Sequence, residues 1–243
     1  IYICHSLFIM RLMMEHHVFI SKQATAQLIL NGFEAFVVQH SGQRRSGIEI
    51  HASVYGTVKQ GKSKTKYQVE FISVDTTADM KAGSVAFKGE TQYLKEHLAK
   101  QIGFERIGGV HTHPYLAHEG DMNFIRKEGC DFSPGDLSYV VEELGSQKNL
   151  RVVEFLLTIK QNQRENTKRD GALDDQKNAF EFSVGNCKCF IRAQVFSLNE
   201  NNELNYEETI LEEEFFKNFE HLFADFGRVK PKDGRKHILG YNY

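Results

Sequence analysis

The chain of 243 residues contains no tryptophan, only three prolines and only four cysteines. Four cysteines spread from position 4 to position 189 do not make the dense disulfide framework of a small secreted domain, so we expect a reducing compartment. The 30 basic and 32 acidic residues nearly cancel, which excludes a global charge that would attract nucleic acid or an anionic membrane. We therefore expect a cytoplasmic protein that binds neither nucleic acid nor membrane.

The sequence also lacks a long apolar run. Its apolar start, residues 1–14, is shorter than the about 20 residues of a membrane-spanning helix, and it lacks the basic region and the cleavage site of a secretory signal. Because the chain begins at Ile1 and not at methionine, we treat residues 1–20 as an N-terminal extension. The alternative start positions are Met10, Met13 and Met14.

The chain does have enough apolar material for one core. It is 41% hydrophobic, contains 19 phenylalanines and has a mean hydropathy of −0.43. No repeat and no low-complexity tract is present, which excludes a coiled coil, a solenoid and a wholly disordered chain. No linker-rich stretch divides the sequence, so we expect a single domain.

Hydrophobic spacing predicts the order of helices and strands. Helices are predicted at residues 22–39, 90–101, 134–145 and 207–226, the first of them capped by Ser21. Strands are predicted at residues 48–58, 65–74, 106–113, 151–160, 180–183 and 187–198, with an exposed loop at 161–178. The pattern predicts an α+β fold whose mostly antiparallel sheet is flanked by helices over residues 21–200, with a C-terminal helix and basic tail over 201–243 packed on the same domain.

Two histidines that lie two positions apart, His111 and His113, give the first chemical signal. In a strand, residues two apart point to the same face, so both imidazoles could hold one ion. Eleven histidines in 243 residues would give roughly 0.5 such pairs by chance, so the pair alone is a weak signal. Its context is stronger, because Pro114 ends the strand directly, and Gly108 and Gly109 leave room for a close approach to the backbone.

The second signal is Ser133-Pro134-Gly135-Asp136. A serine with an acid three positions later at a helix start is a capping box, and proline is favoured at the first helical position. Capping alone accounts for most such sequences. Here the acid also supplies the carboxylate that two histidines need for a three-ligand site with an open fourth position, which is the arrangement of catalytic zinc.

Together these segments resemble the JAMM/MPN family of zinc metalloproteases, whose pattern is an upstream Glu, then H-[S/T]-H-P, then S-x-x-D. The matching segments are His111-Thr112-His113-Pro114 and Ser133-Pro134-Gly135-Asp136, with Cys130 where many members have a cysteine. The resemblance extends over residues 21–198 in the order of elements. It implies a layered fold like that of cytidine deaminases, with Zn2+ held by His111, His113 and Asp136 and with Ser133 stabilising the oxyanion.

The resemblance also implies an upstream glutamate as general acid and base. Glu49 stands at the head of a predicted strand and is followed seven positions later by Gly56, as in the family. The alternative, Glu34, lies inside the first predicted helix between Phe33 and Phe36. We favour Glu49 and keep Glu34 open.

The chain departs from the family between the two motifs, where residues 115–131 form an insertion. We expect this insertion to form a flap over the site. It contains His118, Glu119 and Asp121, which are alternative metal ligands to Asp136.

These residues predict a zinc-dependent peptidase or isopeptidase that cuts an amide bond in the extended tail of ubiquitin, a ubiquitin-like protein or another small protein. The alternative is a catalytically silent MPN-type scaffold or binding module. A nucleobase deaminase is excluded because the H-x-E and P-C-x-x-C elements are missing. Cys187 and Cys189 lack a second cysteine pair and are predicted to be buried apolar thiols, and His16, His17 and His51 are assigned no ligand role.

Overall fold

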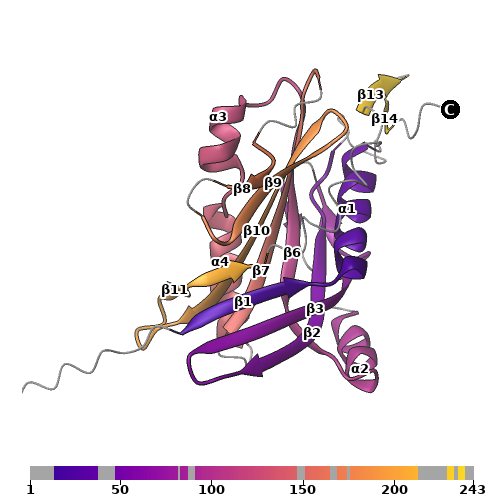
Figure 1. Cartoon of the computed structure of the whole chain (residues 1–243). Helices are drawn as coiled ribbons and strands as arrows, with labels where there is room; N and C mark the ends of the chain where they lie inside the picture. The colour runs from indigo at the N-terminus through magenta and orange to yellow at the C-terminus, as the bar shows by residue number, and fades with distance from the viewer. Residues whose placement is uncertain are drawn as a thin grey trace, which may run out of the picture.

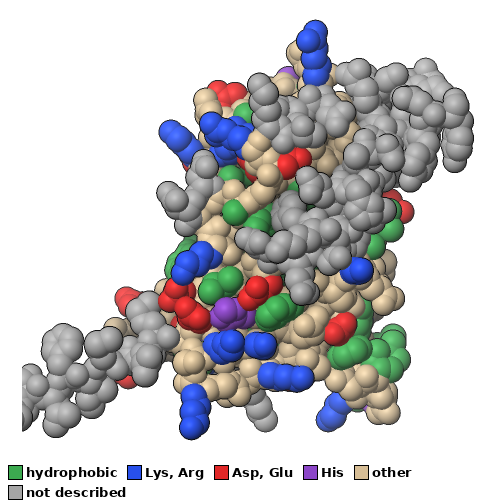
Figure 2. All heavy atoms as spheres, in the orientation of Figure 1, with side chains coloured by type: hydrophobic (Ala, Val, Ile, Leu, Met, Phe, Trp, Pro, Cys, Tyr) green, Lys and Arg blue, Asp and Glu red, His purple; other side chains and the backbone are tan. Residues whose placement is uncertain are grey.

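The computed structural model describes residues 14–37, 47–81, 83–86, 91–146, 151–164, 169–173, 176–212, 229–232 and 235–238. These residues form a curled mixed sheet with helices on both of its faces (Figure 1). The coarse prediction of an α+β arrangement with a mostly antiparallel sheet is therefore confirmed. On the face drawn in Figure 2, acidic and basic side chains are interspersed.

Ten strands form the main sheet in the order β12-β1-β3-β2-β6-β7-β10-β9-β8, with β11 paired to β10. They are β1 Glu15–Ile20, β2 His51–Gln60, β3 Lys64–Val74, β6 Glu105–Tyr115, β7 Arg151–Gln161, β8 Gly171–Ala172, β9 Ala179–Val184, β10 Cys187–Leu198, β11 Leu204–Tyr206 and β12 Thr209–Leu211. The pairs β1/β12, β1/β3 and β6/β7 are parallel, and the other pairs described in this sheet are antiparallel. Two small hairpins stand apart: β4 Asp79–Met80 with β5 Val85–Ala86, and β13 Val229–Lys232 with β14 Arg235–Ile238.

The described helical segments are α1 Lys22–Val37, α2 Gln92–Gln101, α3 Met122–Phe124, the π-helix η1 Ile125–Gly129 and α4 Pro134–Ser146. Ser21 caps α1 as predicted, because its hydroxyl accepts a hydrogen bond from the Ala24 N–H at 3.2 Å. The helix then buries a stripe that includes Leu28, Phe33 and Phe36 against the sheet.

The alternation of β7 divides the core between the two faces of the sheet. Val153 and Phe155 face α1 in the main cluster, whereas Val152 and Leu156 pack with Val140 of α4 on the other face. Both sets are nearly inaccessible to solvent, which explains why β7 reads as a continuous apolar run and not as an alternating one.

The adjacent glycines of β6 allow different contacts. A Cβ on Gly108 would lie 1.8 Å from the carbonyl oxygen of Val153, so only glycine permits this approach of β6 to β7. A Cβ on Gly109 would lie 3.0 Å from a carboxylate oxygen of Glu154, on the face that carries α4. The expected close approach to the backbone is thus made by a neighbouring strand and by a buried acid.

Two predictions about strands are wrong. Pro114 does not end its strand, because β6 continues through it to Tyr115. The loop predicted at 161–178 contains the short strand β8.

Three further predictions need correction. The helix predicted at 207–226 is wrong at its start, because Thr209–Leu211 forms β12 and pairs with β1; residues 213–226 lie outside the described part. Residues 1–20 are not wholly an extension, because Glu15–Ile20 forms β1 within the main sheet. Of the insertion 115–131, only Tyr115 and Glu119 line the cavity described below. Lys160 of β7 holds the carbonyls of residues 116, 117 and 119, and Ile125, Arg126 and Cys130 contact β9 or β10, so the insertion as a whole is not a flap over the cavity.

No described helix combines the length and the apolar character that crossing a membrane requires.

A buried ion pair ties α4 to β6. The Arg106 guanidinium donates a hydrogen bond to the Glu143 carboxylate, and their side chains are only 6% and 3% exposed. Burial alone would lower the pKa of Arg106, but the hydrogen bond and the charge of Glu143 raise it above its usual range. The pair fixes α4 two turns beyond Asp136.

Arg106→Met should lower the free energy of unfolding by about 3 to 5 kcal/mol, because the Glu143 carboxylate stays buried without its arginine. Urea unfolding followed by circular dichroism measures the loss. Lys177→Met is the control, since Lys177 and Glu208 form an exposed pair at 3.4 Å that should contribute less than about 1 kcal/mol. Equal losses in the two variants would contradict a structural role for the buried pair.

Candidate metal centre

Two imidazoles from β6 and one carboxylate from α4 converge on the face of the sheet that carries α4. His111 Nε2 lies 3.2 Å from one Asp136 oxygen, and His113 Nε2 lies 3.5 Å from the other. One ligand atom from each residue can be chosen so that all three lie within 4.8 Å of one another. The period of two along β6 therefore places both histidines as predicted, and the tip of α4 places Asp136 as predicted.

The spacing of these atoms fits a small divalent cation. Tetrahedral zinc with bonds of about 2.0 to 2.1 Å separates neighbouring ligand atoms by about 3.3 Å. The two His–Asp distances, 3.2 Å to Oδ1 and 3.5 Å to Oδ2, are close to that separation, although an aspartate that supplies one ligand atom would use one of the two oxygens. The donor set of two imidazoles and one carboxylate is one that zinc accepts, and it provides three of the four positions.

The capping box and the ligand site use the same carboxylate. The Ser133 N–H donates to Asp136 Oδ2 at 2.6 Å, and the Asp136 N–H donates to Ser133 Oγ at 3.3 Å. The box therefore exists, and it orients the carboxylate while leaving Oδ1 facing His111. Capping and metal binding are thus not competing interpretations of this motif.

Electrostatics within the triad favour an ionised aspartate. Burial would raise the pKa of Asp136, but hydrogen bonds from His111, His113 and Ser133 hold it well below its usual range. Burial likewise opposes the charged form of His113, while the bond to Asp136 and the charges of Asp136 and Glu49 raise the pKa of His113. The same carboxylate thus favours a positive charge beside it, on His113 or on a bound cation.

The triad lines a cavity of about 680 Å³. Its polar lining is Glu49, His51, Ser84, His111, His113, Tyr115, Glu119, Ser133, Asp136, Tyr139 and Glu154. Phe132, Val85 and Val140 give it an apolar wall. A concave site with a few converging polar groups is typical of ligand binding.

The cavity brings Glu49 to the triad and leaves Glu34 away from it. Glu49 precedes β2, where its N–H donates to the Lys81 carbonyl at 2.7 Å, and its side chain lines the cavity. Glu34 is exposed on α1, which lies on the opposite face of the sheet. Ser133 also lines the cavity, and a hydroxyl that accepts one hydrogen bond keeps its own proton to donate.

The alternative ligands in the insertion do not converge. The His118 side chain is 78% exposed, and the Asp121 carboxylate caps α3 by accepting from the N–H groups of Asn123 and Phe124. Glu119 lines the cavity, where its carboxylate accepts from the Leu116 N–H at 2.7 Å. Within the described residues, the triad is the one group of three potential ligands that meets at a point.

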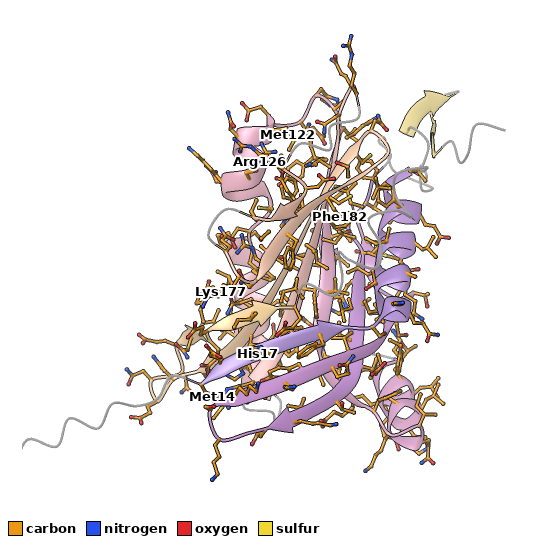
Figure 3. The ribbon with its side chains drawn as sticks, in the orientation of Figure 1. Met14, His17, Met122, Arg126, Lys177 and Phe182 are labelled. Atoms are coloured by element: carbon orange, nitrogen blue, oxygen red, sulfur yellow. The ribbon has the colours of Figure 1, made fainter. Side chains whose placement is uncertain are left out.

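Cys187, Cys189, His16 and His17, which lie outside the triad, have structural contacts. Cys187 and Cys189 are fully buried free thiols, which confirms their prediction. His16 is buried beside the Tyr67 hydroxyl at 3.2 Å. His17, labelled on β1 in Figure 3, contacts Glu15 at 3.2 Å, two positions away in sequence, and the distant Glu212 at 2.5 Å.

Several polar residues of the cavity were not predicted from the sequence, among them Ser84, Tyr139, His51 and Glu154. His51 is paired with His111 across β2 and β6, and burial together with the charge of Arg106 lowers its pKa to about 3. Glu154 accepts from the Gly109 N–H at 2.9 Å, and its pKa is well above its usual range because of burial and the charge of Glu143. One signal was available, since Glu154 interrupts the apolar run of residues 152–157 within β7.

The buried His51 predicts a loss of stability in acid. Its pKa is about 3 when folded against 6.5 in the unfolded chain, so only the unfolded chain gains a proton below pH 6.5. At pH 5 this should lower the free energy of unfolding of the metal-free chain by about 2 kcal/mol relative to pH 7.5.

Urea unfolding at both pH values tests this. In His51→Gln, the free energy of unfolding should fall less between pH 7.5 and pH 5 than in the wild type. The control His97→Gln, at an exposed position on α2, should behave as the wild type. An unchanged fall in His51→Gln would show that His51 does not titrate as described.

Comparison with known proteins identifies neither a family nor a function for this chain. No protein family model matches the chain, and no curated protein matches it. Among solved structures, it is similar to the solution structure of protein DSY2949 from Desulfitobacterium hafniense, with a TM-score of 0.41 and 11% identity over 81% of this chain and 93% of that chain. A likeness at this level defines neither a shared fold nor a function.

Proposed function

We propose that this chain is a zinc-dependent peptidase or isopeptidase of the JAMM/MPN type, with the cytidine-deaminase-like layering of that family. Its substrate would be an amide bond in an extended protein or peptide tail, with ubiquitin and ubiquitin-like proteins as candidates. The observation that carries the proposal is the convergence of His111, His113 and Asp136 in one cavity with Glu49 and Ser133.

The three-ligand set supports catalysis over a purely structural metal. Structural zinc sites are closed by four protein ligands, whereas catalytic sites keep one position open. The triad faces a cavity, so a substrate can reach that position. When bound, zinc would supply Lewis acidity that acidifies water and polarises a carbonyl group.

The protein side chains supply the remaining chemistry. The Glu49 carboxylate would accept a proton from the attacking water and deliver it to the leaving amine. The Ser133 hydroxyl would donate a hydrogen bond to the negative oxygen that develops on the carbonyl, and a donor of this kind typically lowers a barrier by about 2.7 to 4 kcal/mol. Asp136 is oriented for its role by the Ser133 N–H.

The charge of the cavity narrows the substrate class. Among the described residues, the lining has no lysine or arginine and has three carboxylates, Glu49, Glu119 and Asp136, besides the buried Glu154, whose raised pKa favours its neutral form. An enzyme that removes C-terminal residues needs a cation for the free carboxylate. We therefore propose cleavage within a tail or at an isopeptide bond, with neutral or basic groups beside the scissile amide.

Glu49→Gln should keep zinc and lose about 10²- to 10⁴-fold in turnover, because the amide cannot exchange the proton. His113→Ala should lose the metal. The measurements are zinc content of the purified protein and cleavage of lysine-linked ubiquitin chains and fluorogenic peptides, with and without a chelator. Full turnover by Glu49→Gln would reject this residue as the acid and base, and zinc-loaded wild type without any cleavage would favour a silent scaffold.

Matched peptides with lysine, norleucine or glutamate on the leaving side test the charge argument. The glutamate peptide should have a kcat/KM at least about tenfold below that of the norleucine peptide, which corresponds to about 1.4 kcal/mol. Glu119→Gln should narrow the difference, whereas Glu128→Gln, an exposed carboxylate outside the cavity, should not. Equal rates for the three peptides would refute electrostatic selection by the cavity.

A further inference from the structure

An ion pair to β9 holds the inserted segment, residues 115–131, on the sheet. Arg126 of η1 donates to both Glu181 oxygens of β9, at 2.8 and 3.2 Å, and Glu181 is only 1% exposed. Figure 3 shows Met122 and Arg126 together on this segment. A bidentate arginine–carboxylate pair of this kind has one preferred geometry, so it sets the position of η1 relative to β9.

Apolar packing and a hydrogen bond to a backbone carbonyl attach the same segment to β10. Ile125 and Cys130 are buried with Phe190 of β10 in a separate small cluster. Arg192 of β10 donates to the Cys130 carbonyl at 3.0 Å. The end of η1 is therefore held on the same face of the sheet as the histidines.

The last residue of η1 presents its carbonyl to the metal centre. Helix ends leave carbonyl groups without intrahelical partners. The Gly129 carbonyl accepts from the hydroxyl of the fully buried Thr158 at 3.0 Å, and it lies 3.4 Å from His113 Nδ1. His113 of β6 and Thr158 of β7 are paired across the two strands, so the Gly129 carbonyl oxygen can contact both side chains.

Gly129 is closely packed. A Cβ at this position would lie 2.9 Å from Ile125 Cδ1, the end of a side chain, and 3.4 Å from the Tyr115 ring. A larger residue would therefore require the Ile125 side chain to shift. The π-helical turn, closed by the Cys130 N–H donating to the Ile125 carbonyl at 2.9 Å, brings this glycine against β6.

We propose that the inserted segment is a positioning element of the metal centre. The Gly129 carbonyl, held by Thr158, accepts the Nδ1 proton of His113 and so turns the unprotonated Nε2 toward the cavity. Metal-binding histidines generally donate their second ring N–H to such an acceptor, which fixes the tautomer and the ring orientation. The distance of 3.4 Å is at the long end for a hydrogen bond, and the Thr158 hydroxyl, which donates to the same oxygen at 3.0 Å, adds to the contacts that hold the acceptor in place. This role rests on the proposed metal site, but not on the identity of the substrate.

Thr158→Val tests the proposal in the full chain, because it removes the hydroxyl at nearly constant volume. We expect zinc affinity, measured by competition with a chromogenic chelator, to fall about 10- to 100-fold. The visible spectrum of the Co2+-loaded protein should change with it, which a general loss of stability would not cause. Thr158→Ser, which keeps the hydroxyl, should restore wild-type affinity and spectrum.

Thr65→Val is the matched control, since Thr65 is a buried strand threonine on β3, outside the cavity lining. It should leave zinc affinity unchanged, and thermal unfolding of the metal-free proteins shows whether the two valine variants differ in stability. Wild-type affinity in Thr158→Val, or equal losses in the valine and serine variants, would overturn the positioning role alone. A wild type that binds no zinc would overturn the proposed function as well.

Discussion

The Asp136 carboxylate faces two imidazoles because β6 and α4 are fixed relative to each other at separate points. The Arg106–Glu143 pair holds the helix from within, and the apolar cluster around Phe132, Val140 and Phe196 holds it against β7 and β10. The reciprocal bonds between Ser133 and Asp136 then set the carboxylate itself. Rigid elements outside the site thus provide the preorganisation that a metal centre needs.

The titratable groups in and around the triad have pKa values that are shifted in opposite directions. Asp136 is held ionised, whereas burial keeps His51 neutral and raises the pKa of Glu154. Neighbouring titratable groups whose pKa values are driven apart are typical of functional sites. The same burial makes these groups costly to the fold. Next to Glu154, the charge of Glu143 adds to this cost and the charge of Arg106 offsets part of it.

Local patterns predicted much of this structure. The period of two placed His111 and His113 on one face, the capping box placed Asp136, and the helical spacing after Ser21 defined α1. Contacts between residues far apart in the sequence could not be predicted from such local patterns. The acceptor for His113 comes from Gly129 in an insertion, and the strand Thr209–Leu211 has a Phe- and Glu-rich continuation whose helical spacing hid its pairing with β1. The hydrogen bond to Glu154 comes from the Gly109 N–H of a neighbouring strand, and periodicity within one segment cannot predict such a contact.

The central claim is that two imidazoles and one carboxylate bind a single zinc ion. X-ray absorption spectroscopy of the zinc-loaded full chain tests it most directly. We expect one ion per chain with only nitrogen and oxygen neighbours at about 2.0 to 2.1 Å and with the outer-shell scattering of two imidazoles. Sulfur neighbours at about 2.3 Å, or a spectrum without imidazole scattering, would contradict the account.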